Sequence, residues 1–322
     1  MKILVCDDSA VARKAIISHL TSSNEVDISE TSDGLQAMSV LKKEEFDLVL
    51  LDLTMPKFDG YQVLNAIHRD NAISYRPKII VISGDIQKEA IKKCLALGAN
   101  TFLSKPFVFQ QLKNAFSQVG FESCINTITP SLEQHASHEE TLLEGCNIVL
   151  GKSTALLAEH LGQWISMPVP SVFSFEVDDF LEEAIALPDH NNSHRVSQRF
   201  VGGKIHGEAL VCVSGEGLED FAEKMGYNEE YTSKNETLLN LSNLLISTFV
   251  KHFGQLLSQP FSLRQPEIYS GPINIETDNS QLFAISFEYT IDALHIKVVV
   301  CIDQFSLDKL YQLLRGGNLE RE

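Results

Sequence analysis

Five residues with chemically versatile side chains follow short apolar runs in the first third of the chain. Asp7 and Asp8 come directly after one run, and Asp52 ends another. Ser83 and Lys105 follow two more. Three carboxylates that meet in one crevice repel each other unless a cation joins them, and a hard divalent ion such as Mg²⁺ suits oxygen ligands. A lysine and a hydroxyl opposite them would bind the oxygens of a transferred phosphoryl group.

Alternating strands and helices are expected to position these residues. The predicted strands are Ile3–Cys6, Val26–Ser29, Leu48–Asp52, Ile79–Ile82 and Thr101–Leu103. The predicted helices are Val11–Leu20, Gly34–Leu41, Tyr61–Arg69, Gln87–Leu97 and Phe109–Val119. Five such βα units predict an α/β domain, a doubly wound five-stranded parallel sheet with its site at the carboxyl ends of the strands. Surface N-caps would explain Asp7 or Asp8 alone, but not suitable residues at four strand ends.

The strings CDDS, LVLLDLTMPKFDG, VISGD and LSKPF resemble the CheY-like receiver domain of response regulators. The resemblance covers residues 1–121. It implies that Asp52 is the phosphoacceptor. It also implies that Mg²⁺ is bound by Asp8, Asp52 and the backbone carbonyl of Thr54, with Asp7 acting mostly through water.

The same resemblance assigns the residues that respond to phosphorylation. Ser83 takes the place of the switch hydroxyl, and Lys105 that of the lysine that contacts the phosphoryl group. Phe102 takes the place of the switch aromatic, here without a hydroxyl. The Lys105–Pro106 peptide bond is expected to be cis.

The charge of the chain is distributed unevenly. The 322 residues carry a formal net charge of −17 and are 44% hydrophobic, enough for about two folded domains. Residues 1–121 hold 14 Lys and Arg against 14 Asp and Glu, whereas residues 122–322 hold 12 against 29. The whole excess therefore lies in the second part. This acidity argues against nucleic acid as a partner and against binding to an anionic membrane.

Other features concern the location of the protein. No apolar run of about 18 residues is long enough to span a membrane, so no membrane insertion is expected. The Met-Lys start leads directly into a strand, so no signal peptide is expected. Six cysteines without metal-binding spacing suggest reduced thiols. Together these observations predict a cytoplasmic protein.

The second part of the chain contains an internal repeat. After a polar linker at residues 122–137, the string Glu140-Thr-Leu-Leu recurs 96 residues later as Glu236-Thr-Leu-Leu. The same shift pairs Glu144 with Asn240, Asn147 with Asn243, and Pro170 with Pro266. A competing shift of 92 aligns HLGQ with HFGQ but breaks these four motif positions.

Each copy of the repeat begins with a long helical pattern and continues with three alternating segments. The helices are predicted at 138–167 and 235–258, and a final short helix at Phe305–Leu314. The strands are predicted at Val169–Val177, Arg195–Lys204, Gly207–Ser214, Phe261–Tyr269, Gln281–Ile291 and Leu294–Ile302. This predicts an α+β domain over residues 138–322, with an antiparallel sheet, two long helices and two pseudo-repeats at about 138–230 and 235–322.

The spacing acid-x3-Glu-x2-Asn-x22-Pro resembles the CheC/CheX family of chemotaxis phosphatases, and two copies resemble CheC more than CheX. The resemblance implies that Asn147 orients a water for attack on a phosphoaspartate, while Glu144 pairs with the lysine of a receiver. Asn243 would act likewise in the second copy. Asn240 replaces the family glutamate there and cannot form the charged pair, which puts the second site in doubt.

The favoured function is a two-component, chemotaxis-type response regulator. It is phosphorylated on Asp52 by a histidine kinase, and its CheC-like domain acts as a protein phospho-aspartate phosphatase, on its own receiver or on a separate CheY-like protein. The alternative is a non-enzymatic adaptor whose partner binding is gated by phosphorylation. A transcription factor is disfavoured by the acidic second domain and by the lack of a helix-turn-helix pattern. The kinase, the substrate, the sign of the output and a homodimer stay open.

Overall fold

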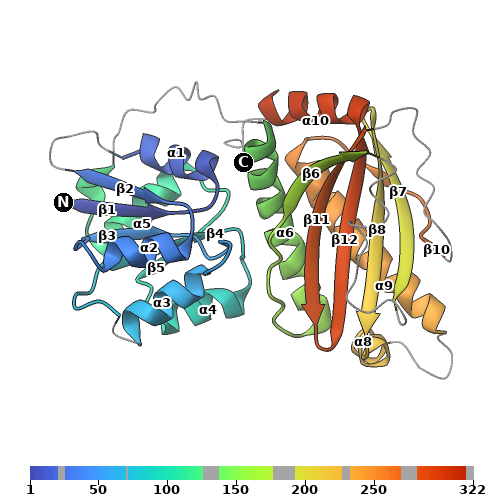
Figure 1. Cartoon of the computed structure of the whole chain (residues 1–322), viewed down its shortest axis with the longest axis horizontal. Helices are drawn as coiled ribbons and strands as arrows, with labels where there is room; N and C mark the ends of the chain where they lie inside the picture. Colours follow the sequence, from blue (N-terminus) through green and yellow to red (C-terminus); the bar gives the residue numbers. More distant parts are fainter. Residues whose placement is uncertain are drawn as a thin grey trace. The chain divides into compact units, whose positions relative to one another are not determined.

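The structure is a computed structural model that describes residues 1–20, 26–69, 72–125, 138–176, 193–226, 233–269 and 281–316 (Figure 1). The chain divides into two compact units, residues 1–144 and residues 145–319. The predicted linker lies largely outside the described residues.

The first unit contains one parallel sheet of five strands. The strands are β1 (Lys2–Cys6), β2 (Asp27–Thr31), β3 (Leu48–Leu51), β4 (Lys78–Ser83) and β5 (Thr101–Ser104). They pair in the order β2-β1-β3-β4-β5, with every neighbouring pair parallel. The predicted parallel sheet is therefore confirmed, and the carboxyl ends of its strands share one edge.

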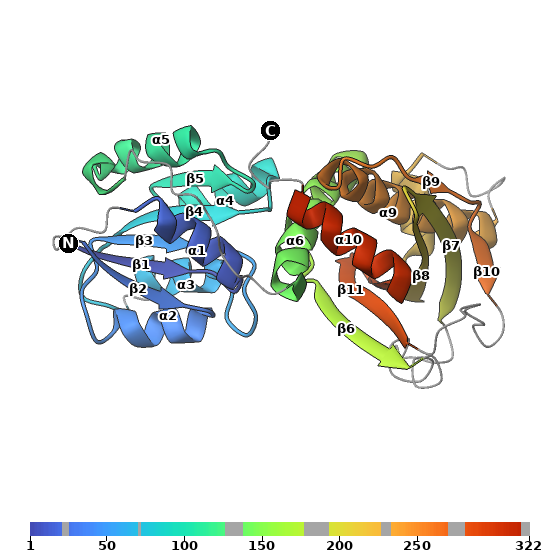
Figure 2. The same cartoon turned by 90° about the horizontal axis from the view of Figure 1, so that it is seen from above.

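Helices cover both faces of this sheet (Figures 1 and 2). The helices are α1 (Ala10–Ser18), α2 (Gly34–Leu41), α3 (Gly60–His68), α4 (Lys88–Ala96) and α5 (Phe109–Val119), followed by the 3₁₀ turn η1 (Glu122–Cys124). Alternate residues of β1 serve different cores. Leu4 and Cys6 pack with α2, α3 and α4, whereas Ile3 and Val5 pack with α1 and α5. Burial on both faces explains why the central strands read as continuous apolar runs.

The second unit is built on an antiparallel sheet, and its first helix begins before the boundary between the units. Its helices are α6 (His138–Leu161), α8 (Leu218–Lys224), α9 (Lys234–Leu256) and α10 (Gln304–Gly316). Its strands are β6 (Ser171–Glu176), β7 (His194–Gly202), β8 (Ile205–Gly215), β9 (Ser262–Leu263), β10 (Glu267–Tyr269), β11 (Gln281–Ile291) and β12 (Leu294–Asp303). The order is β10-β7-β8-β12-β11-β6, and β9 pairs with β7. The predicted combination of antiparallel sheet and helices is confirmed.

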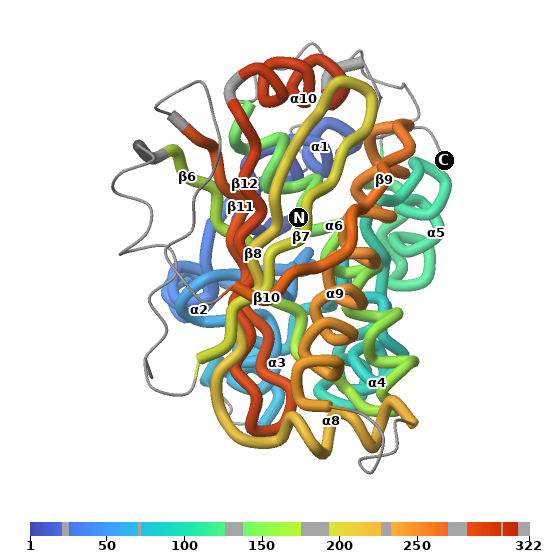
Figure 3. The backbone as a smooth tube through the Cα atoms, turned by 90° about the vertical axis from the view of Figure 1, so that its right-hand side faces the viewer, coloured from blue at the N-terminus to red at the C-terminus, as the bar shows by residue number. Residues whose placement is uncertain are grey.

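The long helices α6 and α9 pack on one face of this sheet (Figure 3). The ring of Phe249 on α9 stacks on that of Phe287 on β11, with centroids 5.1 Å apart. Thr154 Oγ1 on α6 lies 3.4 Å from the hydroxyl of Tyr289, which points to the same face as Phe287. The sheet and the two helices thus share one core, in which α9 also contacts β7 and β8.

Some predicted boundaries in this part are wrong. The helix predicted to reach residue 167 ends at Leu161, because Gly162 adopts a left-handed conformation with φ of 64°. The segment predicted as one strand at Phe261–Tyr269 forms two short strands separated by residues 264–266. Helix α8 was not predicted. Val177, the last residue of another predicted strand, lies outside the described residues.

Two further observations bear on the chain as a whole. None of the described helices has the length and apolar character needed to cross a membrane. All six cysteines are buried as free thiols.

Candidate functional site

The residues predicted to bind a cation converge at the carboxyl edge of the parallel sheet. Asp7 and Asp8 follow β1, and Asp52 follows β3, its neighbour in the sheet. The backbone N–H of Asp52 donates to the carbonyl of Cys6 at 2.8 Å, which extends the pairing of these strands to the site. One carboxylate oxygen from each of the three aspartates lies within 4.8 Å of the other two.

Lys105 joins this cluster from the end of β5. Its Nζ lies 2.8 Å from Oδ2 of Asp7 and 3.0 Å from Oδ2 of Asp52, and all three side chains are buried. Burial alone would lower the pKa of Lys105, but the charges of Asp52 and Asp7 outweigh it and hold that pKa well above its usual range. Lys105 therefore carries a positive charge at the site.

Among the three carboxylates, Asp8 is the one that a bound cation would stabilise most clearly. Its Oδ1 is buried and has no hydrogen-bond partner among the described residues. Burial, reinforced by the charge of Asp52, raises the pKa of Asp8 to about 7. An unpartnered buried carboxylate oxygen is costly, and a bound divalent cation would satisfy it. The donor set of Asp7, Asp8 and Asp52 thus fits the hard oxygen ligands that Mg²⁺ prefers.

Backbone and side-chain hydrogen bonds orient the carboxylates. The N–H of Ser9 donates to Oδ1 of Asp7 at 2.9 Å, and the N–H of Thr54 donates to Oδ1 of Asp52 at 3.2 Å. Arg13 was missed in the sequence analysis. Its Nη1 donates to the carbonyl of Asp7 at 2.7 Å, and its Nε pairs with Glu30 at 3.1 Å. Its position on α1, one helical turn beyond Ser9, was the only sequence signal for this role.

The remaining receiver residues lie at or near the same edge. Ser83 is fully buried at the end of β4, and its Oγ accepts from the N–H of Asp85 at 3.2 Å. Phe102 lies on β5, partly buried against the core formed with α2, α3 and α4. The Lys105–Pro106 peptide bond is cis, as expected.

Glu144 and Asn147 lie one turn apart on α6, so they share one face of the helix. Within the described part of the chain, neither Oε2 of Glu144 nor Oδ1 of Asn147 has a hydrogen-bond partner. These two polar atoms are therefore candidates for contact with a ligand or a water.

The second copy of the motif has a different environment on α9. Asn243 is exposed and Asn240 is partly buried, and both line a surface cleft of about 320 Å³. We call it the Asn243 cleft. Its lining residues are Gln198, Leu239, Asn240, Asn243, Leu263, Arg264, Gln265 and Pro266. The structure thus brings Pro266 of the motif together with its two asparagines.

Gln198 on β7 was also missed by sequence reasoning, and it holds Asn243. Its Nε2 donates to Oδ1 of Asn243 and to the carbonyl of Arg264, each at 2.9 Å. No local pattern marks Gln198, because its contact depends on how α9 packs across β7.

Comparison with known proteins identifies the first unit. Residues 3–117 match the family described as "Response regulator receiver domain". Chemotaxis protein CheY-3 of Vibrio cholerae is 31% identical over 119 residues, which are 37% of this chain and 91% of that protein. The chain therefore belongs to the response regulator receiver domain family through its N-terminal residues.

Solved structures with similarity to the chain include one further receiver and one longer protein. The signal receiver domain of a response regulator from Bermanella marisrubri is 30% identical, with a TM-score of 0.33, and covers 37% of this chain and 96% of its own. The crystal structure of Thermotoga maritima FliY is 15% identical, with a TM-score of 0.42, and covers 58% of this chain and 100% of its own. Likenesses at these values identify neither an activity nor a partner.

Proposed function

We propose that the chain is a chemotaxis-type response regulator whose Asp52 accepts a phosphoryl group from a histidine kinase. Support comes from the carboxylate cluster with Lys105 bound to both Asp7 and Asp52. Asp8, Asp52 and the Thr54 carbonyl would hold Mg²⁺, with Asp7 acting through water. The ion, when bound, neutralises charge on the transferred phosphoryl group. Lys105 then binds a phosphoryl oxygen, and Ser83 donates to another.

The proposed output is hydrolysis of phospho-aspartate by a CheC-like domain over residues 138–322. The substrate is either a separate CheY-like receiver or the chain's own Asp52. Asn147 orients a water that attacks phosphorus, the bond from phosphorus to the aspartate oxygen breaks, and the water protons leave with the phosphate. Glu144 pairs with the lysine of the receiver and keeps Asn147 in register. A carboxamide suffices because phosphoryl transfer depends mainly on positioning and electrostatics.

The observation that carries the catalytic part of the proposal is a pair of polar atoms one turn apart on α6, Oε2 of Glu144 and Oδ1 of Asn147, which have no hydrogen-bond partner among the described residues. The topology supports the proposed repeat. Exchanging β6, β7 and β8 for β10, β11 and β12 turns the strand order into its own reverse. The helices α6 and α9 begin 96 residues apart, which is the shift of the motif.

The test compares phosphate release from a phosphorylated CheY-type receiver by the full chain and its variants, with Mg²⁺ present. Asn147→Ala should lower the rate by roughly a hundredfold, since one positioning group is removed from the transition state. Glu144→Gln should mainly raise KM, because it removes a docking charge. Glu159→Gln, an exposed change of the same charge on the same helix, is the matched control. Unchanged release by Asn147→Ala would show that the site is not catalytic.

Two further variants separate the remaining possibilities. Asp52→Asn prevents phosphorylation of the chain itself, so loss of activity on a separate receiver would show control by Asp52. Asn243→Ala tests the second motif. Retained wild-type release in Asn243→Ala, with loss in Asn147→Ala, would place hydrolysis at the first motif alone.

The second candidate is a phosphorylation-gated adaptor. It is favoured by Asn240, which replaces the glutamate expected to pair with a receiver lysine. This candidate predicts partner binding that changes when Asp52 is phosphorylated, with no phosphate release by any form of the chain. Equal partner binding by the phosphorylated and unphosphorylated chain would exclude gating.

A further inference from the structure

The orientation of the Asn243 carboxamide follows from a chain of hydrogen bonds. The main-chain carbonyl of Arg264 can only accept, so the group that Gln198 presents to it must be its NH₂. The same NH₂ contacts Asn243, which must therefore present its oxygen to Gln198. The Nδ2 hydrogens of Asn243 are consequently not used in this contact, and the residue is exposed. Asn243 thus offers donors, whereas the positioning of an attacking water requires its acceptor.

The charge of the Asn243 cleft, like the donor groups of Asn243, suits an anion. Arg264 is the only charged residue among its lining residues in the described chain, because Asn240 stands where the first motif has Glu144. No carboxylate of the described residues lies within ion-pair distance of the Arg264 guanidinium. The residues that line the cleft therefore include a positive charge and amide donors, on a part of the chain that is strongly acidic.

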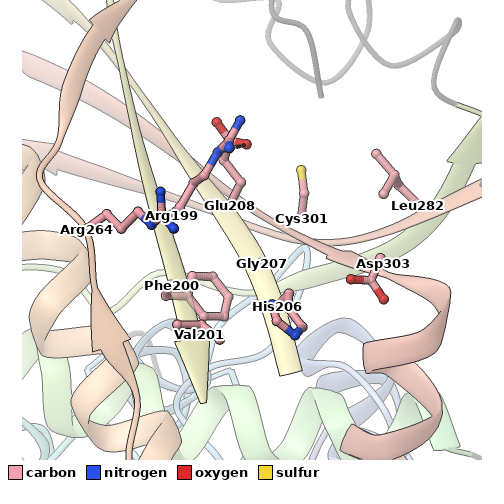
Figure 4. Close-up of a pocket in the computed structure, with 10 residues that line it drawn as sticks. All are labelled: Arg199, Phe200, Val201, His206, Gly207, Glu208, Arg264, Leu282, Cys301 and Asp303. Atoms are coloured by element: carbon pink, nitrogen blue, oxygen red, sulfur yellow. Dashed lines mark hydrogen bonds and ion pairs between the residues drawn. The ribbon is translucent and has the colours of Figure 1, made fainter. Parts of the chain in front are cut away.

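Arg264 also lines a neighbouring pocket of about 340 Å³ (Figure 4). Arg199 lies beside Arg264 there, since the N–H of Arg264 donates to the carbonyl of Arg199 at 2.9 Å. In this pocket Arg199, Glu208 and Asp303 already have partners within the protein. Arg199 Nε lies 3.3 Å from Glu208, and Asp303 accepts from the N–H of Ser306 at 2.7 Å. These three side chains are thus engaged within the protein, whereas no ion pair of the described residues holds Arg264.

A second observation at the cleft points to a ligand. Gln198 is about 1% exposed, and its Oε1 is buried with no hydrogen-bond partner among the described residues. Its NH₂ is held by two acceptors, so the amide cannot turn to relieve this oxygen without losing them. A ligand that carries both oxygen acceptors and one O–H group, as hydrogenphosphate does, would complement Asn243, Arg264 and Gln198 together.

We propose that the Asn243 cleft binds an oxyanion of the phosphate class, either free inorganic phosphate or a phosphorylated side chain of a partner. Arg264 and the Nδ2 of Asn243 donate to its oxygens, and no bond is broken. The two motif sites then differ in charge: the first presents the carboxylate of Glu144, and the second binds an anion through Arg264, which lies between β9 and β10. This inference does not depend on whether the first motif hydrolyses phospho-aspartate.

The test is isothermal titration of the full chain, without divalent cations, with inorganic phosphate and separately with phosphoserine as a phosphomonoester on a side chain. Arg264→Gln and Asn243→Asp should each weaken binding by about tenfold or more, since charge-assisted hydrogen bonds are lost. Lys251→Gln, the removal of an exposed positive charge from the same helix as Asn243, should leave affinity unchanged. Arg264→Lys should retain part of it, and thermal unfolding of each variant checks the fold.

The two ligands distinguish the source of the anion. Binding of both indicates a general phosphate site, and binding of phosphoserine alone indicates a group presented by a partner. Either result supports the proposal if Arg264→Gln and Asn243→Asp lose it while Lys251→Gln does not. The proposal is overturned if the parent chain binds neither ligand, or if Arg264→Gln and Lys251→Gln behave alike.

Discussion

At the scale of single residues, the receiver site is governed by the balance between one lysine and three aspartates. Lys105 neutralises part of the charge of Asp7 and Asp52 through contacts of 2.8 and 3.0 Å. Among the described residues, Oδ1 of Asp8 has no such partner, and the pKa of Asp8 is raised to about 7. The metal-free site is thus poised to exchange a proton on Asp8 for a divalent cation.

This balance predicts that Mg²⁺ affinity depends on pH. Asp8 is ionised above about pH 7 and protonated below it, so affinity should be present at about pH 8 and fall as pH drops through about 7, by up to roughly tenfold per unit. Calorimetric titration with Mg²⁺ at several pH values measures this. Asp8→Asn should bind weakly at every pH. The same affinity at about pH 6 and about pH 8 in the wild type would contradict the prediction.

The raised pKa of Asp8 also has a consequence for stability. Between about pH 4 and about pH 7 the folded chain holds a proton that the unfolded chain has released, so the free energy of unfolding without metal should decrease as pH rises through this range. Added Mg²⁺ should reduce the decrease, because it favours the ionised form.

Arg13 is expected to position the acidic loop without touching the cation. Its Nη1 donates to the carbonyl of Asp7, so Arg13→Gln should weaken Mg²⁺ binding by about tenfold, as changes around metal ligands commonly do. Glu30→Gln is the matched control, because it removes only the exposed ion pair with Arg13. An Mg²⁺ affinity in Arg13→Gln equal to that in Glu30→Gln would argue against the assignment.

At the scale of elements, helix α3 approaches the loop that carries Asp52 very closely. Gly60 begins α3, and its N–H donates to the carbonyl of Leu53 at 3.0 Å. A Cβ added at Gly60 would meet the carbonyl oxygen of Asp52 and lie 2.8 Å from Cα of Leu53. Both are main-chain atoms, so they cannot move away without displacing the site.

Gly60→Ala should therefore destabilise the chain by about 1–3 kcal/mol and weaken Mg²⁺ binding, because relief of the clash shifts Asp52. Chemical denaturation and Mg²⁺ titration measure the two effects. In the control Gly145→Ala, on α6, the closest contact of the added Cβ is the flexible end of Leu256, at 2.9 Å. Wild-type stability in Gly60→Ala would show that the loop is more adaptable than its geometry indicates.

At the scale of the whole molecule, the net charge of −17 belongs entirely to residues 122–322. Such a charge would attract a substrate with a basic surface, and salt would screen the attraction. If the proposed phosphatase acts on a separate receiver, its kcat/KM should fall by about tenfold from low to high ionic strength. Spontaneous phosphate loss from the same receiver is the control. A rate independent of salt would leave the charge without a role in association.

Much of the receiver follows from local pattern. The predicted helices Gly34–Leu41 and Phe109–Val119 have the observed bounds, because apolar periodicity and flanking residues define them locally. Helix α8 was not predicted because seven residues are too few to show a helical period, and it starts after Gly217, whose φ is 112°. The split between β9 and β10 was missed because Pro266, which has no N–H to donate, lies inside an otherwise strand-like segment.

The sequence by itself determined that Asp7, Asp8, Asp52, Ser83 and Lys105 would share one edge, because in a parallel sheet every strand ends on the same side. It also determined the spacing of the motif on each long helix. Only the tertiary structure decided which groups are left unpartnered and which way an amide points. The link from Gln198 to Asn243 and Arg264 joins residues up to 66 positions apart. Such contacts depend on packing and strand register, which no local pattern encodes.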